Sequence, residues 1–153
     1  MNNNDVLRRV RYTFDYNDDK MMAIFQSGGQ EITRAELSDW LKRDDDEAFK
    51  GIYDKQLAVF LNGFINEKRG KKEGEQPIAE KTLNNNLIFR KLKIALKLTD
   101  EDIIEILELV DFKVSKHEIS ALFRNTSHKH YRLCKDQFLR NFLHGMQVKY
   151  KPA

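Results

Sequence analysis

The hydrophobic positions along the chain form helical stripes, and each stripe occurs twice. Apolar residues spaced three or four apart are typical of a helix that buries one face. The first stripe contains Val6, Leu7, Val10 and Phe14, and its counterpart contains Ile88, Phe89, Leu92 and Leu96. Three further stripes follow in each half, so the pattern predicts four helices and then four more.

The stripes belong to an internal duplication. Residues 2–68 align without a gap on residues 84–150, a shift of 82 positions, and 13 of the 67 aligned pairs are identical. A unit of roughly 70 residues has a thin core of its own, which favours packing of the two copies against each other. We therefore predict an all-α fold of two tandem repeats of about four helices each, packed together with a pseudo-two-fold relation.

Polar residues mark where the helices begin. Asparagines 2–4 and 84–86 precede the first stripe of each repeat, and asparagine side chains cap helix starts well. Thr33 with Glu36, and Ser115 with Glu118, form capping boxes that predict the start of each third helix. The fourth helices are expected to start near residues 54 and 136.

A glycine lies inside each fourth helix, at Gly63 and Gly145. Glycine in a helix interior costs about 1 kcal/mol relative to alanine. Because both repeats keep it, we expect another backbone to come close there. Either the two fourth helices cross at these glycines, or each crosses a helix of its own repeat.

Charge divides the chain into unequal parts. Residues 1–70, the first helical repeat, carry 11 basic and 13 acidic groups, whereas residues 84–153, the second, carry 13 and 8. Residues 71–83 carry three of each and contain glycine, which predicts a charged, exposed linker. The net charge of +3 thus hides a difference between −2 and +5.

Composition restricts the class of protein. A single cysteine, Cys134, excludes an internal disulfide, and the longest apolar runs are far shorter than the roughly 20 residues that cross a bilayer. With 41% apolar and 33% charged residues, the chain is too rich in hydrophobes to be disordered. We predict a cytoplasmic protein without a membrane segment.

One segment, residues 128–134, has the residues of a site. Its two histidines and Cys134 could ligate a metal, but a closed site needs a fourth ligand that neither His117 nor His144 is placed to supply. The matching positions of the first repeat hold no such ligand set. No metal and no cofactor are therefore predicted, and a solvated loop is the simpler interpretation.

The same segment can instead form a basic surface with aromatic edges. Basic groups outnumber acids there, which suits an acidic protein partner or head-to-tail pairing with a second copy of the chain. The residues assigned to this surface are His128, Lys129, His130, Tyr131, Arg132, Lys135 and Arg140.

Nucleic-acid binding by the second repeat is the alternative hypothesis. Helices two and three of each repeat resemble a helix-turn-helix, although the stretch between them is longer than the turn of that motif. Basic groups with aromatics can also meet phosphates and stack bases. The candidate residues are Lys113, Lys116, His117 and Arg124.

The sequence contains no signature of an enzyme. It has no Gly-rich phosphate loop, nucleophile elbow or paired His–Glu metal motif. Asp18, Asp100, Glu36 and Glu118 are explained as helix-start carboxylates. We therefore predict a noncatalytic binding module with no catalytic residues.

Several motifs together resemble the YehS-like family of duplicated bacterial cytoplasmic proteins. They are the paired triple asparagines, residues 34–37 (Arg-Ala-Glu-Leu), residues 128–132 (His-Lys-His-Tyr-Arg) and residues 139–143 (Leu-Arg-Asn-Phe-Leu). The likeness covers essentially the whole chain. It implies a duplicated fold and a cytoplasmic compartment, but no reaction, ligand or catalytic residue.

Overall fold

The computed structural model describes residues 1–152, which form eight helices and no strand. The helices of the first repeat are α1 (Asn3–Phe14), α2 (Asp18–Ser27), α3 (Arg34–Leu41) and α4 (Asp54–Arg69). Those of the second repeat are α5 (Asn85–Leu96), α6 (Asp100–Glu108), α7 (Lys116–Leu122) and α8 (Asp136–Tyr150). The prediction of an all-α fold built from two four-helix repeats is confirmed.

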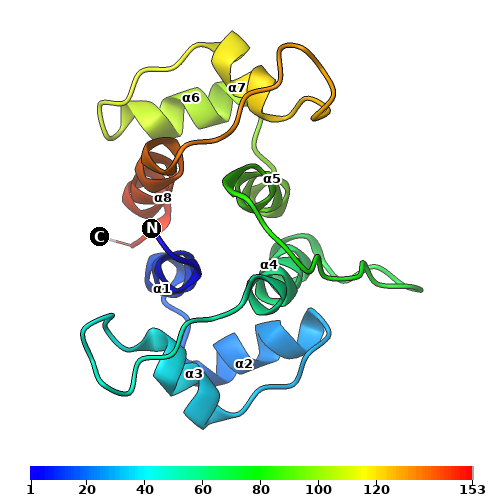
Figure 1. Cartoon of the computed structure of the whole chain (residues 1–153), viewed down its shortest axis with the longest axis vertical. Helices are drawn as coiled ribbons and strands as arrows, with labels where there is room; N and C mark the ends of the chain where they lie inside the picture. Colours follow the sequence, from blue (N-terminus) through cyan, green and yellow to red (C-terminus); the bar gives the residue numbers. More distant parts are fainter. Residues whose placement is uncertain (153) are drawn as a thin grey trace.

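The first and last helices of each repeat form the centre of the molecule. Figure 1 shows α1, α4, α5 and α8 nearly end-on, with α2 and α3 covering one end of the molecule and α6 and α7 the other. Helices α1 and α8 run in the same direction. The Met1 ammonium lies 3.5 Å from Asp136 Oδ2 at their starts, and Lys151 Nζ donates to the Tyr12 carbonyl at 3.0 Å at their ends.

A pseudo-two-fold axis relates the repeats. It turns the contact between α1 and α8, which we call the open seam, into the contact between α4 and α5, which we call the closed seam (Figure 1). At the same shift of 82 positions, Arg69 corresponds to Lys151, and Ile94 corresponds to Tyr12. Arg69 Nη1 donates to the Ile94 carbonyl at 3.1 Å, which matches the bond from Lys151 Nζ to the Tyr12 carbonyl. The predicted symmetry is thus present in individual hydrogen bonds.

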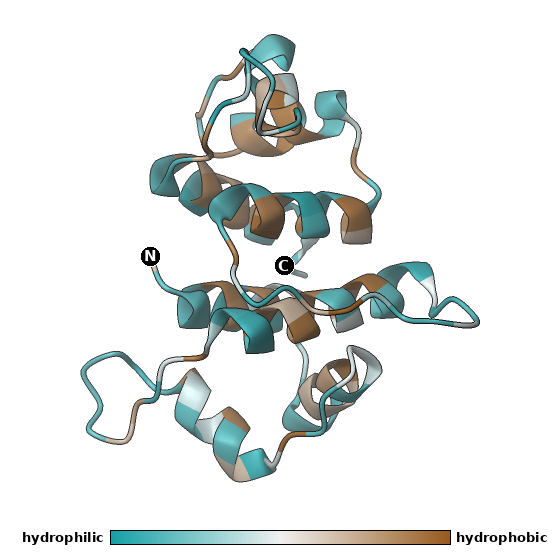
Figure 2. Cartoon of the chain, turned by 45° about the vertical axis from the view of Figure 1, so that its right-hand side comes forward, coloured by the Kyte–Doolittle hydropathy of each residue, from teal (hydrophilic) through white to brown (hydrophobic). Residues whose placement is uncertain are grey.

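Both repeats contribute to one hydrophobic core. Figure 2 shows apolar residues on the inner faces of helices in both halves. The largest fully buried side chains are aromatic, and they come from α2, α4, α5 and α8: Phe25, Phe60, Phe64, Phe89 and Phe142. Because these side chains belong to one continuous cluster, the repeats fold as a single body.

The predicted helix starts are confirmed. The Thr33 and Glu36 side chains each bond the other's backbone N–H, at 3.1 and 2.9 Å, and Ser115 and Glu118 do the same at 3.1 Å each. Helix α2 stops at Gly28. Helix α6 stops without a glycine, because Asp111 adopts the left-handed conformation with φ 58°.

Each asparagine run does more than cap a helix. Within the two runs, the first asparagine of each, Asn2 or Asn84, is the N-cap. The buried Asn4 donates to the carbonyls of Trp40 and Lys50, both at 2.9 Å, and accepts from the Ile52 N–H at 3.0 Å. In the second repeat Asn86 makes the same three contacts, with Leu122, Arg132 and Cys134, at 2.8–3.0 Å.

The hydrogen bonds of Asn4 and Asn86 hold the loop before the fourth helix of each repeat against the first helix. They bring the chain back to the end of the molecule where it started. That return explains why the fourth helix runs in the same direction as the first. Asn3 and Asn85 support it by donating to Asp54 and Asp136, the first residues of α4 and α8, at 2.7 Å each.

The helical glycines mark crossings within a repeat. A Cβ on Gly63 would lie 1.9 Å from the Ile24 carbonyl oxygen of α2, and one on Gly145 would lie 2.4 Å from the Ile106 oxygen of α6. The expected close approach is therefore present. The partner is the second helix of the same repeat, and the alternative of two crossing fourth helices is wrong.

The segment between the repeats has two parts. Residues 71–75 are exposed, whereas Ala79 and Leu83 pack against the core. Figure 2 shows this segment running across the boundary between the repeats before it enters α5. Within residues 1–152, no helix is long and apolar enough to span a membrane.

Candidate binding site

The second repeat has a hollow of about 450 Å³ between α7, the loop that follows it and the start of α8. We call it the repeat-two hollow. It is lined by Phe112, His117, Glu118, Ala121, Leu122, His130, Arg132, Leu133, Lys135, Gln137 and Phe138. Three of the residues assigned from sequence to a partner surface, His130, Arg132 and Lys135, line it.

Its floor is apolar and its rim is mostly basic. Phe112 and Phe138 meet edge to face, with ring centroids 5.9 Å apart, and both pack against the core. Leu133 is 69% exposed, which is unusual for a leucine beside a hollow. A surface of this kind can bury an apolar side chain while its basic groups attract carboxylates.

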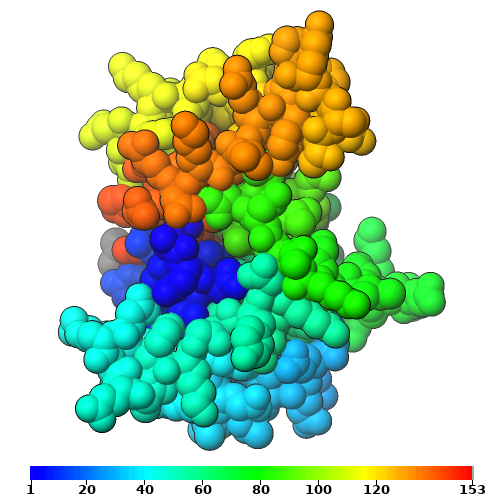
Figure 3. Space-filling view, viewed as in Figure 1, coloured from blue at the N-terminus to red at the C-terminus, as the bar shows by residue number. Residues whose placement is uncertain are grey.

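The first repeat has the matching hollow, with a volume of about 400 Å³. We call it the repeat-one hollow, and every residue that lines it occupies the position 82 before a lining residue of the repeat-two hollow: Glu36, Asp39, Trp40, Lys50, Gly51, Tyr53 and Gln56. Figure 3 shows the two loops concerned, cyan and orange, at opposite ends of the molecule. The duplication therefore produced two hollows, not one.

The two hollows differ in chemistry. Asp39 stands where the second repeat has Ala121, and Gly51 stands where it has Leu133. Lys42 and Lys50 both pair with Asp39, and the hydrogen bond from Lys42 is the main reason that the pKa of Asp39 is lowered. The repeat-one hollow is thus polar and partly neutralised, whereas the repeat-two hollow is apolar with a mostly basic rim.

The histidines gather near the repeat-two hollow. The rings of His117 and His130 have centroids 6.5 Å apart, and those of His128 and His130 are 5.5 Å apart. The sequence hypothesis kept His117 apart from the other two, whereas the fold brings all three together. Among residues 1–152, no group of three or more His, Cys, Asp or Glu side chains is arranged to hold a metal ion.

Cys134 lies on the inner side of the loop. It is only 5% exposed, and its N–H donates to Asn86. Burial, with a smaller contribution from the Asp136 carboxylate, raises the pKa of the thiol to about 12. Its position matches Ile52 of the first repeat, and it acts as a small hydrophobic side chain in the core.

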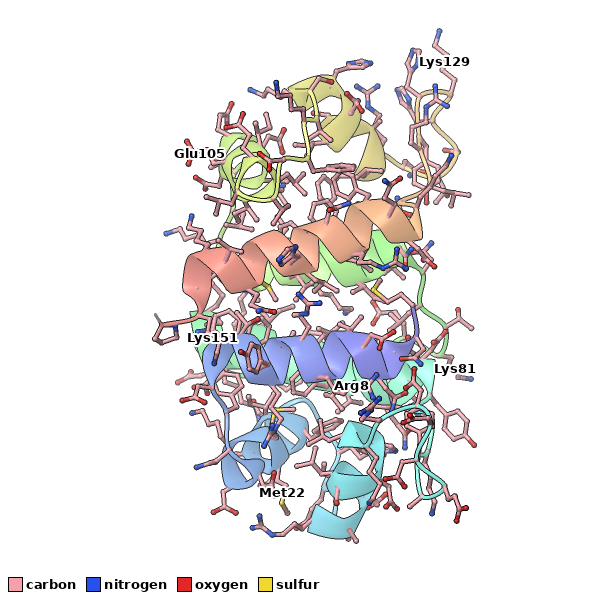
Figure 4. All side chains as sticks on the ribbon, turned by 90° about the vertical axis from the view of Figure 1, so that its left-hand side faces the viewer. Arg8, Met22, Lys81, Glu105, Lys129 and Lys151 are labelled. Atoms are coloured by element: carbon pink, nitrogen blue, oxygen red, sulfur yellow. The ribbon has the colours of Figure 1, made fainter. Side chains whose placement is uncertain are left out.

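The remaining residues of the predicted partner surface do not line the hollow. Lys129 lies at the tip of the loop (Figure 4), and His128 is exposed beside it. Tyr131 lines a separate hollow beside α5. Arg140 belongs to the groove of the open seam, because α8 turns it toward α1. The predicted set is therefore divided among three hollows and the exposed tip of the loop.

The nucleic-acid candidates are also dispersed. Lys116 Nζ lies 2.9 Å from Glu101 Oε1, and that pairing lowers the pKa of Glu101 and raises the pKa of Lys116. His117 lines the repeat-two hollow, and Arg124 lines the hollow beside α5. Lys113 is exposed between α6 and α7. These four residues do not surround one common hollow.

The reasoning from sequence missed the apolar part of the site. Phe112 and Leu133 were not singled out, because neither belongs to a helical stripe. The available signal was the alignment of Leu133 with Gly51 and of His130 with Ala48. Where one repeat has a large side chain and the other a small one, the shared fold does not depend on the large side chain. Such positions are candidates for a function specific to one repeat.

Comparisons with known proteins agree with the duplication. A family model described as "Protein of unknown function (DUF1456)" matches residues 3–70 and again residues 85–151. The chain is 42% identical over 150 residues to "Uncharacterized protein YehS" of Escherichia coli (strain K12), which covers 97% of this chain and 96% of that protein. No solved structure matches the chain significantly. This chain therefore belongs to the DUF1456 family, and each of its repeats matches the family model.

Proposed function

We propose that this chain is a noncatalytic cytoplasmic protein that binds a protein partner through the repeat-two hollow. The partner segment is acidic and carries one large apolar side chain. The apolar side chain packs on the floor formed by Phe112 and Phe138. The carboxylates of the partner segment face Arg132 and Lys135. The observation that carries the proposal is the contrast between two hollows with the same frame, of which one has an apolar floor and a mostly basic rim.

Charge supports an acidic partner. Arg132 and Lys135 have no carboxylate within ion-pair distance among residues 1–152, and the repeat to which they belong has a net charge of +5. Exposed cations without a partner speed association with an acidic segment and make its binding depend on salt. The apolar floor adds affinity that salt does not remove.

Selection from a display library of random short peptides tests the proposal. We expect enrichment of acidic peptides with one aromatic or aliphatic residue. The triple variant Lys129→Gln, Arg132→Gln, Lys135→Gln should bind a selected peptide about ten-fold more weakly, which is equivalent to about 1.4 kcal/mol. Leu133→Gly, which restores the residue of the first repeat, should weaken binding without altering its salt dependence.

A matched control removes the same charge elsewhere. Lys55, Lys71 and Lys72 are exposed and lie outside the described hollows, so their change to Gln should leave peptide affinity unaltered. Equal affinity of the wild-type protein and the Lys129, Arg132, Lys135 variant would refute the proposal. So would a selection that enriches no acidic sequence.

Nucleic-acid binding through Lys113, Lys116, His117 and Arg124 remains the second hypothesis. Because Lys116 is paired with Glu101 and the other residues are dispersed, the geometry favours a peptide. A gel shift with single-stranded and duplex probes at low and moderate salt separates the two hypotheses. A shift that Lys113→Gln and Arg124→Gln abolish would favour the nucleic-acid hypothesis.

A further inference from the structure

The two seams between the repeats share a frame, but within residues 1–152 a chain segment covers only the closed seam. At the closed seam, the Leu83 N–H donates to Asp54 Oδ2 at 2.8 Å. At the open seam, the symmetric position is taken by the Met1 ammonium, 3.5 Å from Asp136 Oδ2. Because the bonds at both ends of the seams correspond, residues between them can be compared position by position.

The closed seam shows how this frame holds an extended segment. Lys91 of α5 is 9% exposed, and its ammonium donates to Asn62 Oδ1 at 2.7 Å. The linker lies over this ammonium and places Glu80 Oε1 3.0 Å from it. Ala79 and Leu83, on either side of Glu80, pack against the core. A carboxylate flanked by small and medium apolar residues is thus the natural occupant of this seam.

At the open seam, no segment of residues 1–152 lies over the corresponding positions, and a groove is left there. The groove has a volume of about 500 Å³ and is lined by Met1, Asp5, Arg8, Arg9, Tyr12, Arg140 and Gln147. Figure 4 looks onto this face, with Arg8 on α1 and Lys151 near the end of α8. Arg9 occupies the position of Lys91, and Arg140 replaces the buried Ala58. The open seam therefore carries one more basic side chain at these two positions than the closed seam.

Two of its arginines have no carboxylate partner. Arg8 pairs with Asp5 and Asp44, at 2.6 and 3.2 Å. Within residues 1–152, neither Arg9 nor Arg140 has a carboxylate within ion-pair distance, and Arg9 donates only to Gln147 Oε1, at 2.9 Å. Burial lowers the pKa of the Arg9 guanidinium, and the smaller effect of the Asp5 carboxylate is to raise it. A half-buried cation in this situation gains from a carboxylate.

We propose that the open seam binds an extended acidic segment of a partner protein, one carboxylate of which meets Arg9 as Glu80 meets Lys91. A second carboxylate meets Arg140, and the exposed Tyr12 ring contacts the segment near the end of α1. This site is distinct from the repeat-two hollow. It requires both repeats, because α1 and α8 each supply one of the two arginines.

The linker itself supplies the probe. A peptide with the sequence of residues 74–83 can be added to the isotopically labelled full chain and followed by amide chemical shifts. The closed seam stays occupied by the covalent linker, whose effective concentration exceeds that of added peptide. We expect shifts at Arg9, Tyr12, Arg140 and Gln147. Each lost ion pair should weaken binding about three-fold, as expected for partly exposed pairs.

Two comparisons identify the contact. The same peptide with Glu80→Gln should bind about three-fold more weakly. The protein variant Arg9→Gln, Arg140→Gln loses both pairs and should bind the peptide about nine-fold more weakly, with smaller shifts at a given peptide concentration. The variant Lys71→Gln, Lys72→Gln should keep the wild-type shifts, and circular dichroism checks that both variants have unchanged helix content. Variants of Arg132 and Lys135 should also keep them, which separates this site from the repeat-two hollow.

Several results would overturn the proposal. One is the absence of shifts at the highest soluble peptide concentration, and another is a set of shifts away from α1 and α8. An equal response to the Glu80→Gln peptide would also contradict it. If inorganic phosphate shifts Arg9 and Arg140 and the peptide does not, the groove is a small-anion site and the proposed segment does not bind there.

Discussion

The two repeats differ least where they build the fold and most where they meet solvent. Both keep the buried asparagine at the start of the first helix, the capping box of the third and the glycine of the fourth. They differ in the hollow beside the third helix and in the residues along the seams. This contrast teaches that the common frame accounts for folding, while the differences indicate where each repeat can bind.

The glycine crossings should give the largest effect. Gly63→Ala places a Cβ 1.9 Å from a carbonyl oxygen, so it should lower the free energy of unfolding by about 3 kcal/mol. Gly145→Ala, at 2.4 Å, should cost about half as much. Urea unfolding measures both, and Gly51→Ala is the control, since a Cβ there meets nothing within 4 Å. Equal, small losses at both glycines would contradict the crossing geometry.

The buried asparagines should give the next effect, and it should be equal in the two repeats. Asn4→Ala and Asn86→Ala each leave one N–H and two carbonyls without their partner, which should cost about 2 kcal/mol. Asn141→Ala is the control and should have little effect on urea unfolding, because Asn141 is only partly buried and its amide donates to a carbonyl of its own helix, that of Gln137. A much smaller loss at Asn86 would mean that the second repeat holds its loop in another way.

Removal of the corresponding cations Lys91 and Arg9 should destabilise the protein to different extents at the two seams. Lys91→Met leaves Glu80 and Asn62 without their partner in a buried place, so we expect a loss of about 1–2 kcal/mol. Arg9→Met at the open seam should cost less than about 0.5 kcal/mol, because Arg9 is half-buried and bonds only Gln147. Urea unfolding of both variants decides the matter. Similar losses would mean that the seams are equally closed.

The smallest effect on stability is expected at Cys134, whose counterpart in the first repeat is Ile52. Cys134→Val should change stability by less than about 1 kcal/mol, since the bond to Asn86 uses the backbone N–H. Because the pKa of the thiol is raised to about 12, the folded protein should hold almost no thiolate at pH 8 and react slowly with iodoacetamide. A thiol that reacts as fast folded as in urea would contradict the burial of the loop.

The local features of the fold could be predicted from the sequence because they depend on near neighbours. The capping boxes and the helical stripes each involve residues a few positions apart. The roles of Asn4 and Asn86 could not be predicted, because their partners lie 36–48 residues away along the chain. Only the fold brings these groups together.

The candidate sites were predicted in part for the same reason. Arg132 and Lys135 were singled out from the local charge, but Phe112 joins them only through the packing of the α6–α7 connection. Arg140 was grouped with them because it is near in sequence, whereas its position on α8 directs it to the open seam. The covered and uncovered seams depend on the path of the linker, which sequence spacing does not reveal.

The central claim is that two repeats share one core, and each repeat carries its own natural probe. Trp40, the only tryptophan, is buried in the first repeat, and Cys134, the only cysteine, is buried in the second. Urea unfolding followed by tryptophan fluorescence and by pulsed alkylation of Cys134 should give a single transition with one midpoint. Alkylation of Cys134 at a urea concentration where Trp40 still reports a folded repeat would contradict the account.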